Sequence, residues 1–315
     1  MTTIPIPLID GAFLIDNSSL EQLRCPRLYQ QKLLQKRTPV AERAGANFGS
    51  TMHRGWQSRY ELCGNKEVNP TAEAVINEAM NAWLLENPQP PQDFRNFNHA
   101  CRVMAVYNKQ YKNENFKILV NPKDGKPIIE SSFALPIGTV QNTPIIYCGK
   151  VDLGIEDPQG TWSFDHKTTF QFGRTFEKQM EMDGGQLGYM WALWQATGKL
   201  PMGYIIDAVR IRKPSKGDDF AGTAPIDGSD FLRIPFPKTQ DVLEDWKNNV
   251  LSLVDDLFHY HDKSYFPMHR WHCTNKFGLC DFIDVCSTVP SQREMVLQSN
   301  LYEENTWTPL KGTKE

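Results

Sequence analysis

The first third of the chain has helical periodicity. Apolar residues recur every three or four positions in four stretches, at about 20–37, 45–63, 71–86 and 98–112. Ser18 followed by Glu21 has the spacing of a capping box, which predicts the start of the first helix. Pro26 is expected to kink that helix or to set back its true start, because proline removes a backbone donor. We therefore expect this region to be mostly helical.

From Lys117 onward the period of the pattern becomes two. Four segments with turn signals between them are expected to form an antiparallel meander, at 117–120, 127–137, 143–156 and 161–170. A long helix from about Glu177 to Thr197 is predicted next, and then a strand within 202–213. A further strand and a helix from about Thr239 to Tyr260 follow. This order of helices and strands predicts an α/β fold.

Length and charge limit the class of protein. The chain has 315 residues, enough for one large domain or two modest ones. No stretch approaches the roughly 18 apolar residues that indicate a membrane span, and the first residues do not resemble a secretory signal. We therefore expect a cytoplasmic protein without a membrane partner. The net charge is -3, so any contact with nucleic acid must come from local basic patches.

The segment YCGKVDLGIEDPQGTWSFDHKTTF carries the most informative polar residues. Asp152 lies on one predicted strand, and Asp165 and Lys167 share one face of the next because they alternate with His166. Two carboxylates that converge repel each other unless a cation lies between them, and oxygen ligands suit Mg²⁺ or Mn²⁺. A lysine beside such a cation can activate water or neutralise charge on a phosphate. The alternative is a local cap at Asp152 and an exposed Asp165–Lys167 ion pair.

Seven cysteines are an odd number, and without a secretory signal they favour reduced thiols or metal ligation over a disulfide framework. Cys273, Cys280 and Cys286 lie close together in the sequence, and three metal ligands need a fourth. Four thiolates would suit either a [4Fe-4S] cluster or tetrahedral zinc. His269 and His272 leave a mixed cysteine and histidine zinc site open.

Four short motifs occur in a fixed order along the chain. They are GSTMH at 49–53, GKVD at 149–152, DHK at 165–167 and QLGY at 186–189. In this order they resemble the PD-(D/E)XK nuclease superfamily, and specifically its RecB-like branch. The resemblance implies a restriction-endonuclease-like core with a mixed central sheet flanked by helices.

The resemblance also implies a role for each matched residue. The implied metal ligands are His53, Asp152, Asp165 and the backbone carbonyl of His166. Lys167 would be the catalytic lysine, and Gln186 and Tyr189 would support it and the scissile phosphate. Taken alone, Gln186 and Tyr189 could equally mark the polar edge of an apolar helix. Glu130 stands where this branch often carries a strand glutamate, and we consider it as a further site residue.

Cys25, in the segment CPRLY, extends the resemblance to the iron–sulfur members of this branch, including the AddB-type and CRISPR-associated adaptation exonucleases. It implies that Cys25, Cys273, Cys280 and Cys286 bind a [4Fe-4S] cluster that joins the two ends of the chain. The gap between Cys273 and Cys280 is longer than is common in that family. Zinc at the same residues and four unligated thiols are the alternatives.

We expect four regions along the chain. They are an N-terminal helix carrying Cys25 at 1–44, a nuclease core at 45–262 with a helical insertion at about 64–115, a cysteine-rich metal-binding segment at 263–290 and a loosely attached tail at 291–315.

The function that the resemblance implies is that of a divalent-metal-dependent exodeoxyribonuclease. We expect it to digest single-stranded DNA or free DNA ends, with 5′ to 3′ polarity favoured, in recombination, repair or end processing. A helicase or a recombination protein is the expected partner. The alternatives are a non-catalytic DNA-binding or scaffolding subunit of a recombination complex, and an RNA-directed nuclease.

Overall fold

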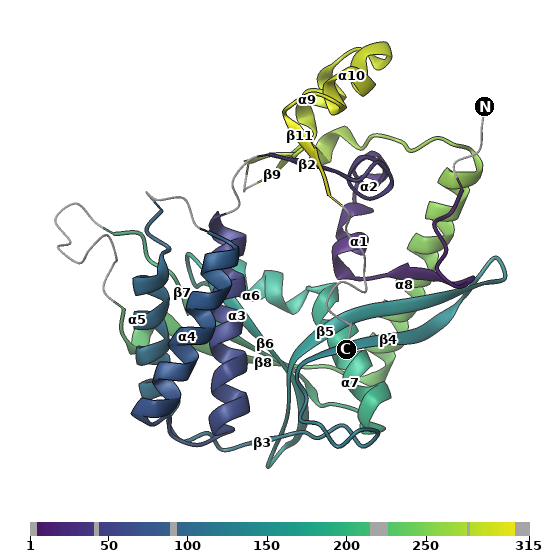
Figure 1. The fold of residues 1–315 in the computed structure, drawn as a ribbon. Coiled ribbons are helices and arrows are strands. Elements are labelled where there is room, and N and C mark those ends of the chain that lie inside the picture. The colour runs from purple at the N-terminus through teal and green to yellow at the C-terminus, as the bar shows by residue number, and fades with distance from the viewer. Residues whose placement is uncertain (1–4, 41–43, 89–92, 215–225, 276–277, 306–315) are drawn as a thin grey trace. The chain divides into compact units, whose positions relative to one another are not determined.

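A computed structural model describes residues 5–40, 44–88, 93–214, 226–275 and 278–305. The chain divides into two compact units (Figure 1). We call Glu42–Ser131 with Lys150–Leu243 the core unit, and Met1–Ala41, Ser132–Gly149 and Glu244–Glu315 together the terminal unit. Each unit is considered by itself.

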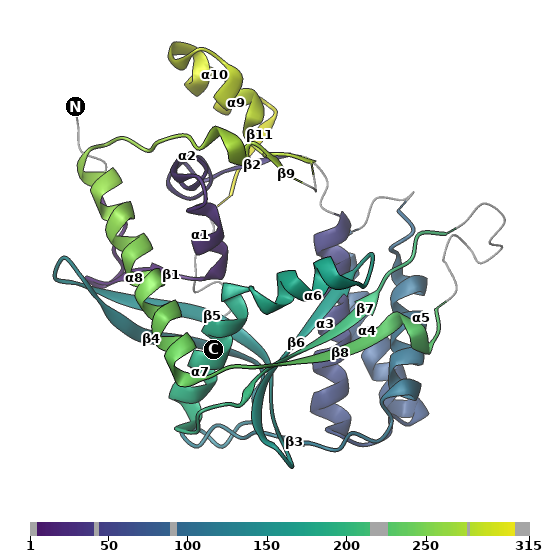
Figure 2. The same ribbon diagram turned by 180° about the vertical axis from the view of Figure 1, so that it is seen from behind.

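Three helices lie side by side in the core unit, as Figures 1 and 2 show. They are α3 (Ala44–Cys63), α4 (Pro70–Glu86) and α5 (Phe97–Gln110). The side chains of Asn69 and Asn96 cap α4 and α5 by accepting hydrogen bonds from backbone N–H groups in the first turn. The buried faces of the three helices meet in one apolar cluster that contains Trp56, Met80 and Met104. The predicted helices of this region are confirmed.

The core unit also contains a mixed sheet. Its strands are β3 (Lys117–Ile118), the second half of β5 (Thr143–Asp157), β6 (Gly160–Thr169), β7 (Gly203–Arg210) and β8 (Phe231–Pro237), with a short 3₁₀ turn η2 (Gly228–Asp230) before β8. β5 pairs with β6 in antiparallel orientation, β6 with β7 in parallel, and β7 with β8 in antiparallel orientation.

Alternate residues of β7 pack on opposite faces of this sheet, as the two-residue period of a strand requires. Val209 joins the cluster of α3 to α5, whereas Tyr204 and Ile206 pack with Phe176 on the other side. Helices therefore cover both faces of a central mixed sheet. The expected α/β fold with a restriction-endonuclease-like core is confirmed.

The crossover from β6 to β7 consists of two helices, α6 (Arg174–Glu181) and α7 (Gly184–Thr197). The prediction of a single long helix at 177–197 is therefore wrong. Asp183 has an extended backbone, and its side chain accepts a hydrogen bond of 2.8 Å from the backbone N–H of Gly185. This capping interaction starts a new helix, and the two glycines that follow Asp183 do little to continue the old one.

The terminal unit begins with β1 (Phe13–Ile15), α1 (Asn17–Gln22), α2 (Pro26–Tyr29) and a π-helix η1 (Gln30–Leu34). Pro26 occupies the first turn of α2, so the predicted helix at 20–37 is divided there. β1 pairs in parallel with the first half of β5. The longest helix, α8 (Gln240–Asp262), ends in this unit, and β4 (Ile129–Val140) contributes most of its residues to it.

Short elements form the rest of the terminal unit. They are β2 (Arg37–Pro39), η3 (Arg270–His272), β9 (Thr274–Asn275), β10 (Gly278–Leu279), α9 (Ile283–Ser287), η4 (Pro290–Gln292), α10 (Arg293–Leu297) and β11 (Tyr302–Glu304). β11 pairs with β2, and the Tyr302 ring stacks on Phe282 with a centroid distance of 5.3 Å. As far as residue 305, the predicted tail is therefore folded and not loosely attached; residues 306–315 lie outside the described part.

Across the described segments, none of the helices combines the length and apolar character that crossing a membrane would require.

Candidate active site

Three predicted or considered site residues converge in the core unit from different elements. His53 lies on α3, Glu130 at the start of β4 and Asp152 on β5. His53 Nδ1 lies 3.1 Å from Glu130 Oε1 and 3.4 Å from Asp152 Oδ2. One ligand atom from each of the three residues can be chosen so that all lie within 4.8 Å of one another, which makes this group a candidate metal site. The histidine and two carboxylates suit a divalent cation.

Glu130 is the member of this group that the sequence indicates least strongly. Its sequence signals are a charged residue in the segment IIESSF and a position where the resembled branch often carries a strand glutamate. Its backbone φ of 44° lies in the left-handed region, which non-glycine residues rarely adopt. Backbone strain of this kind is concentrated at functional sites. Lys150 Nζ lies 2.5 Å from Glu130 Oε2, so the carboxylate is held from both sides.

His53, Glu130 and Asp152 shift one another's pKa values. Burial and the nearby carboxylates of Asp165 and Glu130 raise the pKa of Asp152 to about 6, although His53 opposes this. Burial also disfavours the charged form of Glu130, but hydrogen bonds from His53 and Lys150 outweigh it and lower its pKa to about 2. Burial opposes protonation of His53, yet Asp152 and Glu130 raise its pKa to about 9. The site therefore favours positive charge at its centre.

Asp165 and Lys167 face the same side of β6, as their spacing predicts. Lys167 Nζ lies 2.7 Å from Asp165 Oδ2, and the Asp165 residue is only 2% exposed. Burial would favour the neutral amine, but Asp165 and Asp152 outweigh it and raise the pKa of Lys167. The lysine is therefore a cation beside the carboxylates. Asp165 lies outside the closely spaced metal group and is held by Lys167 instead.

The buried side chain of His166 packs edge to face against the ring of His53, with ring centroids 6.3 Å apart. Its ring stacks on Trp56 with a centroid distance of 4.5 Å, and its Nδ1 lies 2.9 Å from Asp207 Oδ2. Asp207 also accepts hydrogen bonds from Tyr107 Oη at 2.6 Å and Arg233 Nε at 2.8 Å. The backbone N–H of His166 donates to Asp152 at 3.0 Å. This network fixes the part of β6 between Asp165 and Lys167.

Sequence reasoning did not identify Asp207. The feature that could have identified Asp207 is the presence of a carboxylate inside the apolar strand segment GYIIDAVR. A carboxylate that is 2% exposed requires partners, and His166, Tyr107 and Arg233 provide them.

Gln186 and Tyr189 lie on α7. Tyr189 is close enough to Lys167 to raise the lysine's pKa. Gln186 is 1% exposed, and its buried side-chain oxygen has no hydrogen-bond partner among the described residues. No described contact joins Gln186 to Lys167.

The four cysteines of the predicted cluster are all in the terminal unit. Burial raises the pKa of Cys286, and the thiols of Cys280, Cys25 and Cys273 raise it further, so the four lie in one neighbourhood. The backbone N–H of Cys280 donates to the carbonyl of Cys273 at 2.8 Å. No three of these sulfurs lie within 4.8 Å of one another in the described part of the chain.

Polar groups surround these sulfurs. The backbone N–H of His269 donates to Cys25 Sγ at 3.4 Å, and Gln31 Nε2 donates to Cys286 Sγ at 3.8 Å. Donors of this kind stabilise thiolates. His269 Nδ1 lies 2.9 Å from the carbonyl of Arg24, so this ring nitrogen is already engaged.

Comparison with known proteins identifies the family. No curated protein sequence matches the chain significantly. The crystal structure of SSO0001 aligns with 85% of this chain and 83% of its own, at 13% sequence identity and a TM-score of 0.31, which is too weak a likeness to argue from. The family model of the PD-(D/E)XK nuclease superfamily matches residues 18–287, which include every residue of the site described above. The chain therefore belongs to the PD-(D/E)XK nuclease superfamily, whose members are metal-dependent enzymes that hydrolyse phosphodiester bonds.

Proposed function

We propose that this chain is a divalent-metal-dependent exodeoxyribonuclease of the RecB-like branch that acts on single-stranded DNA ends. The observation that carries the proposal is the convergence of His53, Glu130 and Asp152 beside the Asp165–Lys167 pair. Histidine and carboxylate ligands with an adjacent lysine are groups that suit metal-assisted phosphodiester hydrolysis.

His53, Glu130 and Asp152 are the residues that would hold Mg²⁺ or Mn²⁺, with Asp165 and the His166 carbonyl as the further ligands that the family resemblance implies. When bound, the cation would polarise the phosphoryl oxygen and lower the pKa of the attacking water. Asp152 is already oriented by the backbone N–H of His166, so one of its oxygens is fixed before a cation arrives.

Lys167 provides the cationic donor of the site. Asp165 holds the ammonium group at 2.7 Å, and this ion pair fixes its position on β6. From there Lys167 donates hydrogen bonds to the attacking water or to the charged phosphate oxygens. Tyr189 and Gln186 on α7 support this role: Tyr189 acts electrostatically on Lys167, and Gln186 has a buried oxygen free to accept a donor.

For the cysteines, we propose a [4Fe-4S] cluster bound by Cys25, Cys273, Cys280 and Cys286. The shared neighbourhood of the four thiols within the terminal unit supports a site bound by all of them. The N–H donors to Cys25 and Cys286 also suit an iron–sulfur site.

The preference for single-stranded ends, the 5′ to 3′ polarity and the role in recombination, repair or end processing come from the family resemblance. A helicase or recombination protein would supply such ends.

Cleavage of DNA labelled at one end tests the enzymatic proposal directly. We expect anaerobically purified protein to digest single-stranded DNA with Mg²⁺ or Mn²⁺, to be inactive with EDTA, and to lose activity by at least about 1,000-fold in Lys167→Ala. Lys199→Ala is the matched control, because Lys199 also pairs with a carboxylate, Glu156, at 3.1 Å but lies on the surface. Undiminished metal-dependent cleavage by Lys167→Ala would refute the assignment, and absence of cleavage by folded wild-type protein would favour a DNA-binding subunit.

A further inference from the structure

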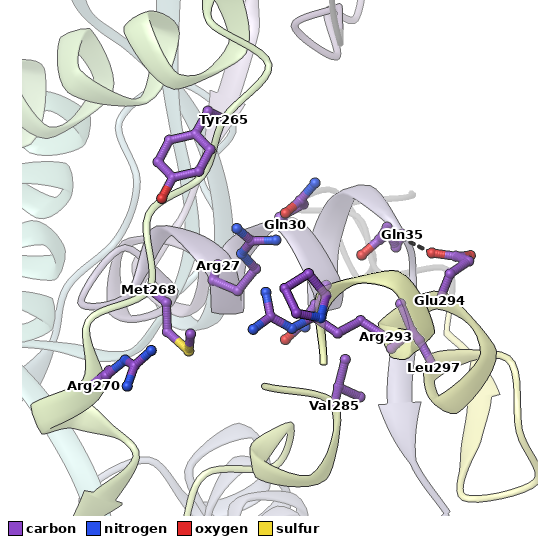
Figure 3. Close-up of a pocket in the computed structure, with 12 residues that line it drawn as sticks. Arg27, Gln30, Gln35, Tyr265, Met268, Arg270, Val285, Arg293, Glu294 and Leu297 are labelled. Carbon is purple, nitrogen blue, oxygen red and sulfur yellow. Dashed lines mark hydrogen bonds between the residues drawn. The ribbon is translucent and has the colours of Figure 1, made fainter. Parts of the chain in front are cut away.

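The terminal unit contains a pocket of about 590 Å³ (Figure 3). Its walls come from α2 and the π-helix after it, from residues 265–270 and from residues 285–297. All of these segments belong to the terminal unit, so the pocket is complete within one compact unit. Its volume is typical of pockets that bind small molecules.

Positive charge predominates in this pocket. Arg27, Arg270 and Arg293 line it, against one acidic residue, Glu294. None of the three arginines forms an ion pair with another described residue, and Arg27 Nε is buried without a hydrogen-bond partner among them. The Glu294 carboxylate accepts hydrogen bonds from the side-chain amides of Gln35 and Gln298 instead. The pocket therefore has guanidinium groups available for an anion.

Arg293 is held in place by backbone carbonyls. Its Nε donates to Thr288 O at 3.1 Å and its Nη2 to Cys286 O at 3.3 Å. An arginine anchored by neutral acceptors keeps its full charge, and guanidinium groups bind phosphate oxygens with matched geometry. The remaining N–H groups of Arg293 can therefore donate to the oxygens of a phosphate.

The rest of the wall suits a nucleobase. The Tyr265 residue is 61% exposed, and the guanidinium carbon of Arg27 lies 6.0 Å from its ring centroid. Gln30 adds an amide that can both donate and accept, while the side chains of Val285 and Leu297 are buried beneath. Aromatic rings stack on bases of any sequence, and side-chain amides pair with base edges.

We propose that this pocket binds a nucleoside monophosphate, with its phosphate on Arg27, Arg270 and Arg293 and its base against Tyr265. The same chemical group is offered by a free nucleotide and by the phosphorylated end of a DNA strand. The site contains no residue of the His53 group and lies in the other unit. Binding there is therefore independent of whether the chain cleaves DNA.

Equilibrium binding to the full-length, anaerobically purified protein tests this proposal. The probes are dAMP, inorganic phosphate, and one short oligodeoxynucleotide prepared with either a 5′-phosphate or a 5′-hydroxyl. No divalent metal is added, so no metal-dependent cleavage competes with binding. The variants are Arg27→Gln, the exposed Arg270→Gln, Glu294→Gln, and Arg24→Gln as a matched control that is exposed on the same segment but does not line the pocket.

We expect saturable dAMP binding that Arg27→Gln and Arg270→Gln each weaken by about 10-fold, since each removes a charge-assisted hydrogen bond. Glu294→Gln should tighten binding and Arg24→Gln should leave it unchanged. Tighter binding of the 5′-phosphorylated strand than of dAMP would assign the site to strand ends, and the reverse would assign it to free nucleotides.

Three results would overturn the proposal. They are no saturable binding of dAMP or the phosphorylated strand by folded protein, equal affinity for dAMP and inorganic phosphate, and equal weakening by Arg24→Gln. Because Arg270 is exposed, its variant tests the site even if Arg27→Gln fails to fold.

Discussion

At the scale of single residues, the role of Glu130 as a metal ligand can be tested directly. It pairs with both His53 and Lys150 at the candidate metal site, at 3.1 and 2.5 Å. Glu130→Gln should weaken Mn²⁺ binding by roughly 10-fold, because affinity for hard cations depends on the number of charged ligands. Titration calorimetry measures this, with Glu156→Gln, at an exposed ion pair, as the control. Equal affinities of the two variants would remove Glu130 from the ligand set.

Asp207 offers a second residue-scale test, through pH. Burial alone would raise the pKa of its carboxyl, but Arg233 and His166 outweigh burial and lower it. A carboxyl with a lowered folded-state pKa stabilises the protein above its unfolded pKa of about 3.9, and this contribution is lost as pH falls further. Asp207→Asn should therefore lower the free energy of unfolding by about 3 kcal/mol at pH 7, because it breaks a buried ion pair. Urea denaturation at pH 7 and pH 3 measures the difference in the free energy of unfolding between wild type and Asp207→Asn. This difference should be smaller at pH 3 than at pH 7. An equal difference at both pH values would contradict a lowered pKa of Asp207.

At the scale of elements, the β7–β8 pairing has a strict steric requirement at Gly203. A Cβ atom added there would lie 2.2 Å from the carbonyl oxygen of Phe236 on β8. Gly203→Ala should therefore cost about 1–3 kcal/mol of stability, as overpacking does, seen as a lower urea midpoint. Gly49→Ala is the control: its Cβ would meet only Thr168 Oγ1, at 3.6 Å, and alanine favours the α3 helix. Equal midpoints for the two variants would show that β8 can move away.

At the scale of the whole molecule, both ends of the chain belong to one compact unit. Cys25 packs in the same apolar cluster as Phe282 and Tyr302, with Cys280 against it. If a [4Fe-4S] cluster joins these segments, anaerobic protein should absorb broadly at about 400 nm. Cys25→Ser should then abolish this absorption and lower the melting temperature, whereas Cys63→Ser on α3 should do neither. A colourless wild-type protein with stoichiometric zinc would contradict the iron–sulfur assignment.

The sequence by itself determined the helices at about 45–63, 71–86 and 98–112, the change to strands at Lys117 and the shared face of Asp165 and Lys167. These features depend on local periodicity and capping, which neighbouring residues specify. Only the tertiary structure decided that Glu130 joins His53 and Asp152, that Asp207 holds His166, and that arginines from distant segments line one pocket. Such groups meet only when loops close and separate elements pack, and no local pattern specifies which side chains then converge.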